Sequence, residues 1–149
     1  MDPKSLTNDF KEFLQFLNDH GVEYLVIGGH AVAYHGYPRA TNDLDVWVAV
    51  NEANATRLVD ALRAFGFAMP DVTPSLFLRA DRIIRMGVAP NRIEIQTGID
   101  GVEFADCYPR RIATELDGVQ VFFIGLADLK ANKRASGRNK DLADLDELP

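Results

Sequence analysis

The sequence predicts an α/β or α+β fold, in which a small mixed β-sheet is flanked by helices. Three observations support this. Apolar residues recur at helical spacing in some segments, short β-branched and aromatic runs typical of strands fill others, and glycine, proline and asparagine separate the two kinds. The 149 residues are enough for one compact domain. We therefore expect a single domain over residues 1–149, with C-terminal helices from about residue 126.

Five elements are expected in the first part of the chain. They are, in order, a helix on which Phe10, Phe13, Leu14 and Leu17 share one face, a buried strand at 23–28, a short helix at 29–36, a strand at 43–50, and a helix whose apolar face holds Ala55, Leu58, Leu62 and Phe65. Thr7 or Asn8 would cap the first helix and Asn51 the last, while Gly21 and Gly66 would end them.

The second part predicts four strands and two helices. Residues 67–81 are expected to be a loop with one helical turn near Ser75–Leu78, because Pro70 and Pro74 break any longer regular element. The expected strands are 82–87 and 91–96, joined by a Pro90-Asn91 turn, and 110–116 and 118–125, which would form a hairpin across Asp117-Gly118. The two helices start at Leu126 and are divided near Ser136-Gly137, and the last has Leu142, Leu145 and Leu148 on its apolar side.

Composition narrows the class of protein. Hydrophobic residues make up 47% and charged residues 26%, which is typical of a soluble globular chain. Cys107 is the only cysteine, so no intrachain disulfide is possible and a reducing compartment is favoured. No apolar run has the length of a signal peptide or a membrane span, so a cytoplasmic protein without membrane contact is expected. A net charge of -6 disfavours a general polyanion-binding surface, although lysines and arginines from Lys130 to Lys140 allow a local basic patch.

Two aspartates interrupt a strongly β-forming stretch. Asp43 and Asp45 are two residues apart, so on a strand their side chains point to the same face. Adjacent carboxylates raise each other's pKa unless a positive charge lies between them, and Mg²⁺ prefers such oxygen ligands. Glu94 can join the pair if its strand lies beside theirs. The alternative is an amphipathic strand whose outer face is simply solvated.

A glycine pair, Gly28-Gly29, stands between the buried strand and the short helix. Without a Cβ the backbone can approach a phosphate closely, and free N–H groups at a helix start attract anionic oxygens. A plain turn is the simpler interpretation. The sequence contains neither the P-loop pattern nor the GxGxxG dinucleotide pattern.

The order of these features resembles the nucleotidyltransferase superfamily typified by DNA polymerase beta. Its signature is an apolar residue, Gly, then Gly or Ser, a spacer, and Asp-x-Asp or Asp-x-Glu, with a third acidic residue on a later strand. Here Ile27-Gly28-Gly29 is followed by thirteen residues and then Asp43-Leu44-Asp45. The string from His30 through Arg39 and Thr41, and the tail "LADLKANKRASGRNKDLADLDEL", are similar to small bacterial members, some of which belong to toxin–antitoxin or abortive-infection systems. The resemblance covers most of residues 22–148.

The resemblance implies a role for each matching residue. Gly28 and Gly29 would hold the triphosphate, Asp43 and Asp45 would bind two Mg²⁺ ions, with Mn²⁺ as a possible substitute, and Glu94 would be the third ligand. Relatives commonly have Asp at the third position, and Glu94 departs from this pattern with a side chain that is one methylene longer.

Other candidates surround this set. The further nucleotide-binding candidates are His30, Arg39, Thr41, Lys133 and Arg138. For Lys133 and Arg138 the alternative is a favourable charge near a helix C-terminus. Asp141 and Asp144 are expected to pair with Lys140 or solvent. Trp47 is expected on the carboxylate side, either as a stacking surface for a base or as a half-exposed strand aromatic.

The resemblance implies a Mg²⁺-dependent nucleotidyltransferase that moves a nucleoside monophosphate from a nucleoside triphosphate such as ATP to a hydroxyl. The acceptor could be a protein side chain, an RNA 3′ end or a small molecule. The alternative is a catalytically silent fold that acts as a binding or regulatory subunit, for example in a toxin–antitoxin pair. A phosphohydrolase fits the metal chemistry but not the glycine-to-aspartate spacing. Larger relatives add a helical domain that holds the base and the acceptor. A homodimer or a partner chain could supply this part of the site for the present chain.

Overall fold

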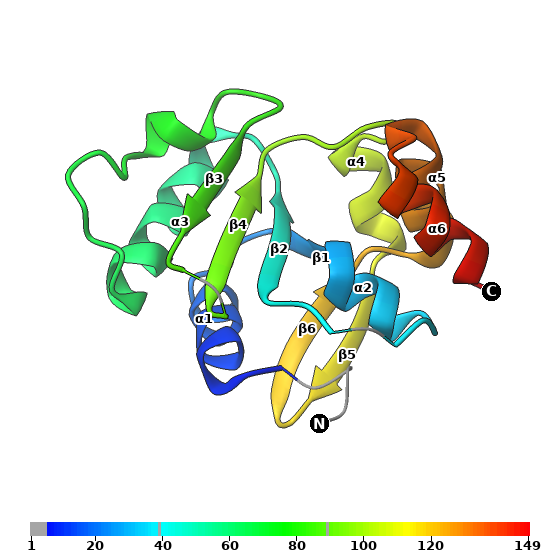
Figure 1. Ribbon diagram of the computed structural model, residues 1–149. Coiled ribbons are helices and arrows are strands. Elements are labelled where there is room, and N and C mark those ends of the chain that lie inside the picture. The colour runs from blue at the N-terminus through cyan, green and yellow to red at the C-terminus, as the bar shows by residue number, and fades with distance from the viewer. Residues whose placement is uncertain (1–5, 39, 89) are drawn as a thin grey trace.

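The computed structural model describes residues 6–38, 40–88 and 90–149, and this part of the chain folds into one mixed sheet with helices around it (Figure 1). In chain order its elements are α1 (Asn8–Asp19), β1 (Tyr24–Ile27), α2 (Gly28–Tyr34), β2 (Asp43–Val48), α3 (Glu52–Phe65), the 3-10 turn η1 (Pro74–Phe77), β3 (Ile83–Met86), β4 (Arg92–Gln96), α4 (Phe104–Cys107), the 3-10 turn η2 (Tyr108–Arg110), β5 (Ile112–Leu116), β6 (Val119–Phe123), α5 (Leu126–Ser136) and α6 (Asn139–Glu147). The predicted α/β class and every predicted strand are confirmed.

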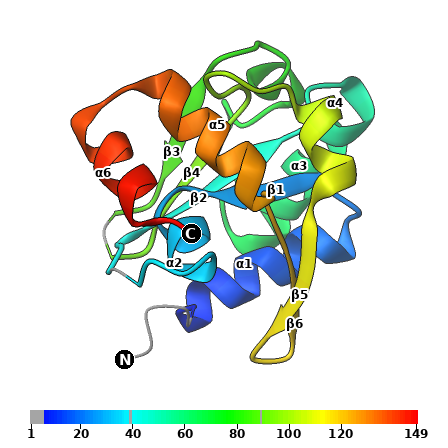
Figure 2. The same ribbon diagram turned by 90° about the vertical axis from the view of Figure 1, so that its right-hand side faces the viewer.

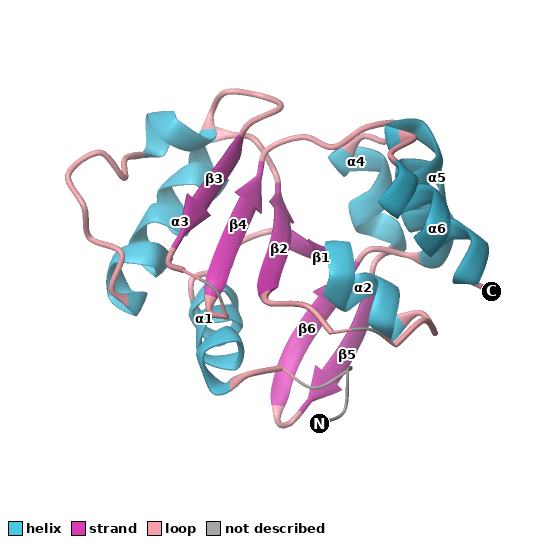
Figure 3. Cartoon of the chain, in the orientation of Figure 1, coloured by secondary structure: helices cyan, strands magenta, loops and turns pink. Residues whose placement is uncertain are grey.

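The six strands lie in the order β3-β4-β2-β1-β6-β5 (Figure 3). β1 pairs with β2 antiparallel, and β2 pairs with β4 parallel. The expected hairpins form, since β3 pairs with β4 and β5 with β6, both antiparallel. β6 joins the rest of the sheet through a parallel pairing with β1, in which Val26 lies opposite Phe123.

Local signals in the sequence set the helix boundaries. The Thr7 hydroxyl accepts a hydrogen bond from the Phe10 amide at 3.2 Å, which caps α1. Asn51 caps α3 in the same way through the Asn54 amide, at 2.8 Å. Gly66 follows α3 with a φ of 127°, a conformation that favours glycine. The predicted caps and stops are therefore confirmed at both helices.

The strand alternation separates a core face from a polar face. Leu44 and Val46 on β2 and Ile93 and Ile95 on β4 are buried, and they join the core cluster with residues of α1 and α3. Figures 1 and 2 show α1 and α3 on one side of the sheet. The helices α2, α5 and α6 lie to the right of β2 and β4 in Figure 1, on the same side of these two strands as β1. The opposite face of β2 and β4, which carries the acidic residues, is thus not packed against α1 or α3.

The last helix, α6, follows the apolar side predicted from its leucines only in part. Leu142 is 40% exposed, whereas Asp141 and Asp144 are each 2% exposed. Leu148 is buried, as expected, at the end of this segment. Leu145 is half-buried, so the prediction was wrong for Leu142. The buried face of α6 also holds Asp141 and Asp144, because both aspartates form ion pairs with Lys133 of α5.

Two further features concern the chain as a whole. The short α4 and η2, which lead from the end of β4 toward β5, were not predicted from the sequence. Within the described ranges, no helix combines the length and the apolar character needed to cross a membrane.

Candidate functional site

The sheet register brings two of the predicted acidic residues together. β2 and β4 run parallel with Asp45 opposite Glu94 and Asp43 opposite Arg92. Because neighbouring strands are about 4.8 Å apart, side chains at paired positions on one face are in contact range. The expectation that the Glu94 strand lies beside the aspartate strand is confirmed.

Asp45 has an unfavourable environment for a negative charge. Burial, followed by the nearby carboxylate of Glu94, raises the pKa of Asp45 to about 7. Its Oδ1 atom is buried, and among the described residues it has no hydrogen-bond partner. Glu94 can share a proton with Asp45, but two ionised carboxylates only repel each other. A cation between them would relieve this cost.

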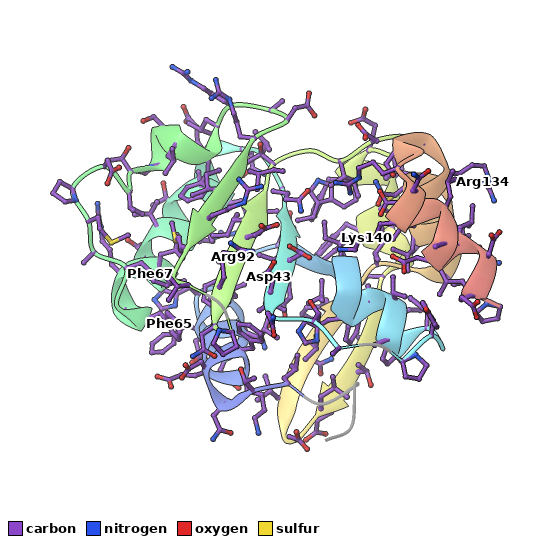
Figure 4. The ribbon with its side chains drawn as sticks, viewed as in Figure 1. Asp43, Phe65, Phe67, Arg92, Arg134 and Lys140 are labelled. Carbon is purple, nitrogen blue, oxygen red and sulfur yellow. The ribbon has the colours of Figure 1, made fainter. Side chains whose placement is uncertain are left out.

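Two arginines form ion pairs with the other acidic side chains, Asp43 and Glu94. The Arg92 guanidinium donates to both carboxylate oxygens of Asp43, from Nε to Oδ1 and from Nη2 to Oδ2, each at 3.0 Å. Arg85 of β3 donates from Nε to Oε1 of Glu94 at 2.9 Å. Figure 4 shows Asp43 and Arg92 side by side on the open face of the sheet. Both arginines alternate with apolar residues on their strands, but only the register reveals that they face the acids.

The donor set fits a hard divalent cation in part. In the ranges that the structure describes, no group of three or more acidic, histidine or cysteine side chains is placed to hold a metal ion. Asp45 and Glu94 nevertheless lie side by side, and the orphaned Oδ1 of Asp45 is a free oxygen ligand. Mg²⁺ is commonly held by one or two carboxylates together with substrate phosphates. Asp43 could join them once it releases Arg92.

The glycine pair lies directly against the aspartates. Gly28 has a φ of 67°, and a Cβ there would overlap Oδ2 of Asp45. A Cβ at Gly29 would lie 2.9 Å from Cβ of Thr41, closer than real Cβ contacts allow. Thr41 in turn donates from its hydroxyl to the Asp43 carbonyl at 3.2 Å. Four of the predicted site residues therefore lie together, with Gly28 against Asp45 on β2 and Gly29 against Thr41 just before that strand.

His30 lies in the core. It is 6% exposed, and its ring meets Phe10 edge to face at a centroid distance of 5.7 Å. Burial lowers the pKa of His30 to about 4, so the ring is neutral near pH 7. Its contact with a nucleotide remains a prediction. Arg39, another candidate, lies outside the described residues.

Lys133 and Arg138 hold the last two helices together. The Lys133 ammonium donates to Asp141 at 2.9 Å and to Asp144 at 3.1 Å, and all three side chains are at most 6% exposed. Arg138 donates from Nε to Asp141 at 2.7 Å. Burial opposes ionisation of Asp141, but hydrogen bonds from Ser136, Lys133 and Arg138 outweigh it and lower its pKa to about 2. The expected pairing of these aspartates with Lys140 or solvent was wrong, because Lys133 is buried between them.

Lys140 is a functional candidate that sequence reasoning assigned elsewhere. It is exposed at the start of α6, and its charge lowers the pKa of Asp45. In Figure 4 it lies between α6 and β2, on the side of the acidic residues. Its position next to Asp141 in the sequence had suggested a local pair, and only the packing of α6 brings it near Asp45.

Comparisons with known proteins agree with this arrangement. The model of a family described as nucleotidyltransferase of unknown function (DUF6036) matches residues 4–148. A presumed nucleotidyltransferase from Thermotoga maritima is 15% identical with a TM-score of 0.58, over 92% of this chain and 88% of that chain. An antigenic nucleotidyltransferase-like protein from Paracoccidioides brasiliensis is 16% identical with a TM-score of 0.53, over 95% and 76%. At these identities the likeness is one of fold. None of the curated proteins is significantly similar in sequence to the chain.

Proposed function

This chain belongs to the family of nucleotidyltransferases of unknown function, and we propose that it is an active member, which transfers a nucleoside monophosphate from a nucleoside triphosphate to a hydroxyl group in the presence of Mg²⁺. The family confirms the superfamily that the glycine and aspartate motifs indicated, and the six-stranded mixed sheet agrees with the fold of the two solved structures. The family membership is shown, whereas the nucleotide, the metal ion and the acceptor are part of what we propose.

One observation carries the proposal, which is the environment of Asp45. A buried carboxylate beside Glu94, with an unpartnered Oδ1 and a raised pKa, costs folding free energy and gives nothing to the core. The glycine turn at Gly28 leaves just enough room for it. A buried carboxylate with a raised pKa, such as Asp45 beside the Gly28 turn, is typical of a functional site.

The residues of the chain have distinct roles in the proposed reaction. Gly28 and Gly29 present backbone N–H groups to the triphosphate, and Lys140 adds a positive charge near Asp45. Asp45 and Glu94, with Asp43 released from Arg92, would hold Mg²⁺, which when bound stabilises phosphate charge and lowers the pKa of the attacking hydroxyl. The acceptor oxygen forms a bond to the α-phosphorus, the bond from that phosphorus to the bridging oxygen breaks, and pyrophosphate leaves with the electron pair. The hydroxyl proton passes to the carboxylate pair of Asp45 and Glu94.

A specific observation favours a second candidate, the catalytically silent binding or regulatory subunit. Arg92 and Arg85 neutralise Asp43 and Glu94, so two of the three acids already have partners without any metal. A silent scaffold would keep these pairs permanently. An active enzyme must exchange at least the Asp43 pair when metal and nucleotide bind.

The test is transfer of label from α-labelled ATP, CTP, GTP and UTP in a cell extract with Mg²⁺. We expect label in an acceptor fraction with the wild-type protein, and a decrease of at least about a hundredfold with Asp45→Asn. Asp60→Asn, an exposed acid on α3, is the matched control and should retain transfer. Because Asp45→Asn removes a repelled buried charge, its thermal midpoint should equal or exceed that of the wild type, so lost transfer cannot be ascribed to unfolding.

Two results would contradict the proposal. Transfer that survives Asp45→Asn would remove the carboxylate pair from the chemistry. Absence of label with every nucleotide, together with thermal stabilisation by nucleotide and Mg²⁺ that is equal in wild type and Asp45→Asn, would establish the silent scaffold instead.

A further inference from the structure

A cavity of about 560 Å³ lies at the carboxyl ends of β2 and β4. It is lined by residues from the end of β2, from the segment after β4 and from α4, and Figure 1 shows that this segment crosses from β4 to α4 at that end of the sheet. Trp47 lines it and stands two residues beyond Asp45 on the same strand face. At a strand rise of about 3.3 Å per residue, the wall of the cavity begins roughly 7 Å from the acidic site.

The cavity has a rigid aromatic wall. The Trp47 ring is almost completely buried and meets Phe104 edge to face, with centroids 5.2 Å apart. Phe104 in turn stacks on Tyr108, also at 5.2 Å. These three rings give the cavity an apolar side against which the carbon atoms of a small organic molecule can pack.

The charged residues of the lining all have one sign. Glu23, Asp81 and Glu103 are lining residues, and no lysine, arginine or histidine lines the cavity in the part of the chain that the structure describes. Arg111, whose guanidinium lies 4.1 Å from the centre of the Tyr108 ring, is not among the lining residues. A triphosphate would be repelled by these carboxylates, whereas a cation would be attracted by them.

We propose that this cavity binds the acceptor, and that the acceptor is a small organic cation bearing a hydroxyl group. The proposal rests on the proposed function and names its substrate class. The volume is that of a site for a small molecule and is too small for a folded macromolecule. An ammonium group held among the carboxylates and aromatic rings would direct the attached hydroxyl along the strand toward Asp45. Transfer would join the hydroxyl oxygen to the α-phosphorus, release pyrophosphate and leave the proton on the carboxylate pair, which gives a phosphodiester that carries the cation.

Trp47 provides a direct assay, because it is the only tryptophan of the chain and it lines the cavity. Its fluorescence is titrated, without nucleotide or metal, with two pairs of compounds that differ mainly in charge. These are choline with 3,3-dimethyl-1-butanol, and N-methylglucamine with sorbitol. We expect the cation of at least one pair to bind about tenfold more tightly than its neutral partner.

The matched variants test the carboxylates. Asp81 and Glu103 are exposed, and Asn tolerates the φ of 58° at position 81, so Asp81→Asn/Glu103→Gln should fold normally. We expect this double variant to lose most of the preference for the cation, while Asp60→Asn on α3 keeps it. Circular dichroism and thermal midpoints verify that all three proteins fold.

Two binding results would overturn the inference: equal affinity for cation and neutral partner in both pairs, or an unchanged preference in the double variant. Different results overturn the inference and the proposed function. Cation binding with no label transfer from any nucleotide overturns the proposed function and the acceptor role that depends on it. Label transfer to a neutral or anionic acceptor, without cation binding, overturns only the inference.

Discussion

At the scale of single residues, Gly28 and Asp45 have to be considered together. Sequence reasoning offered two interpretations of Gly28, a phosphate contact or a plain turn. The structure adds a third reason for glycine, because the missing side chain makes room for the Asp45 carboxylate. This requirement links positions 28 and 45 across two strands, and no local pattern in the sequence could reveal it.

The buried histidine on α2 leads to a pH-dependent stability. Its pKa in the folded protein is lowered to about 4 from 6.5 by burial, so the unfolded chain binds the proton more tightly. Its contribution to stability is therefore intact above pH 6.5 and is lost as the pH falls toward 4. From pH 7 to pH 5 we expect His30 alone to lower the free energy of unfolding by about 2 kcal/mol.

Urea denaturation at both pH values, for wild type and His30→Leu, measures this contribution. Other groups titrate in the same range, among them Asp45, whose raised pKa acts in the opposite direction. The difference between the two proteins isolates His30. If both lose the same free energy between pH 7 and pH 5, the histidine does not titrate as its burial requires.

At the scale of helices and strands, the sequence predicted most elements because their signals are local. The caps at Thr7 and Asn51 and the alternation of β2 and β4 are set by residues next to each other in the chain. The orientation of α6 could not be predicted, since it depends on an ion pair with Lys133 in another helix. The arginine partners of the acids were missed for the same reason, because strand register is not local.

The ion pairs of Lys133 should dominate the docking of α6 on α5. Replacing Lys133 by Ala leaves Asp141 and Asp144 buried without their shared cation, which should lower the free energy of unfolding by about 3–5 kcal/mol. The neighbouring Arg134 is exposed, and Figure 4 shows it at the outer side of the helix pair. Arg134→Ala should change stability by less than about 0.5 kcal/mol.

Denaturant unfolding of the two variants in parallel makes this comparison. Similar stabilities for Lys133→Ala and Arg134→Ala would show that the buried pairs do not hold α6 in place. A large loss for Lys133→Ala alone would show that this candidate for phosphate binding has a structural role, whatever else it does.

At the scale of the whole molecule, the two ends of the acidic strand face have opposite chemistries. Near Asp43 the face carries Arg92, with Lys140 close to Asp45, which suits an anionic triphosphate. Beyond Trp47 it leads to the cavity with its acidic lining. Sequence patterns predicted the acids on this face, but the cavity is built from distant segments and could be recognised only in the folded chain.

The β5–β6 hairpin joins the rest of the sheet through the parallel pairing of β1 with β6, and it need not open together with the other strands. Val26 and Phe123 are about a hundred residues apart in the chain, and Figure 2 shows the β5–β6 hairpin extending away from the other strands. β1 to β4, by contrast, lie within one continuous stretch that includes α1 and α3. We expect amide hydrogen exchange to reveal a sub-global opening, in which the β5–β6 amides exchange at a lower free energy than those of β1, β2 and β4. Uniform protection across all six strands would show a single cooperative unit. With two units, the hairpin could detach and reattach while the strands that carry the acids stay folded.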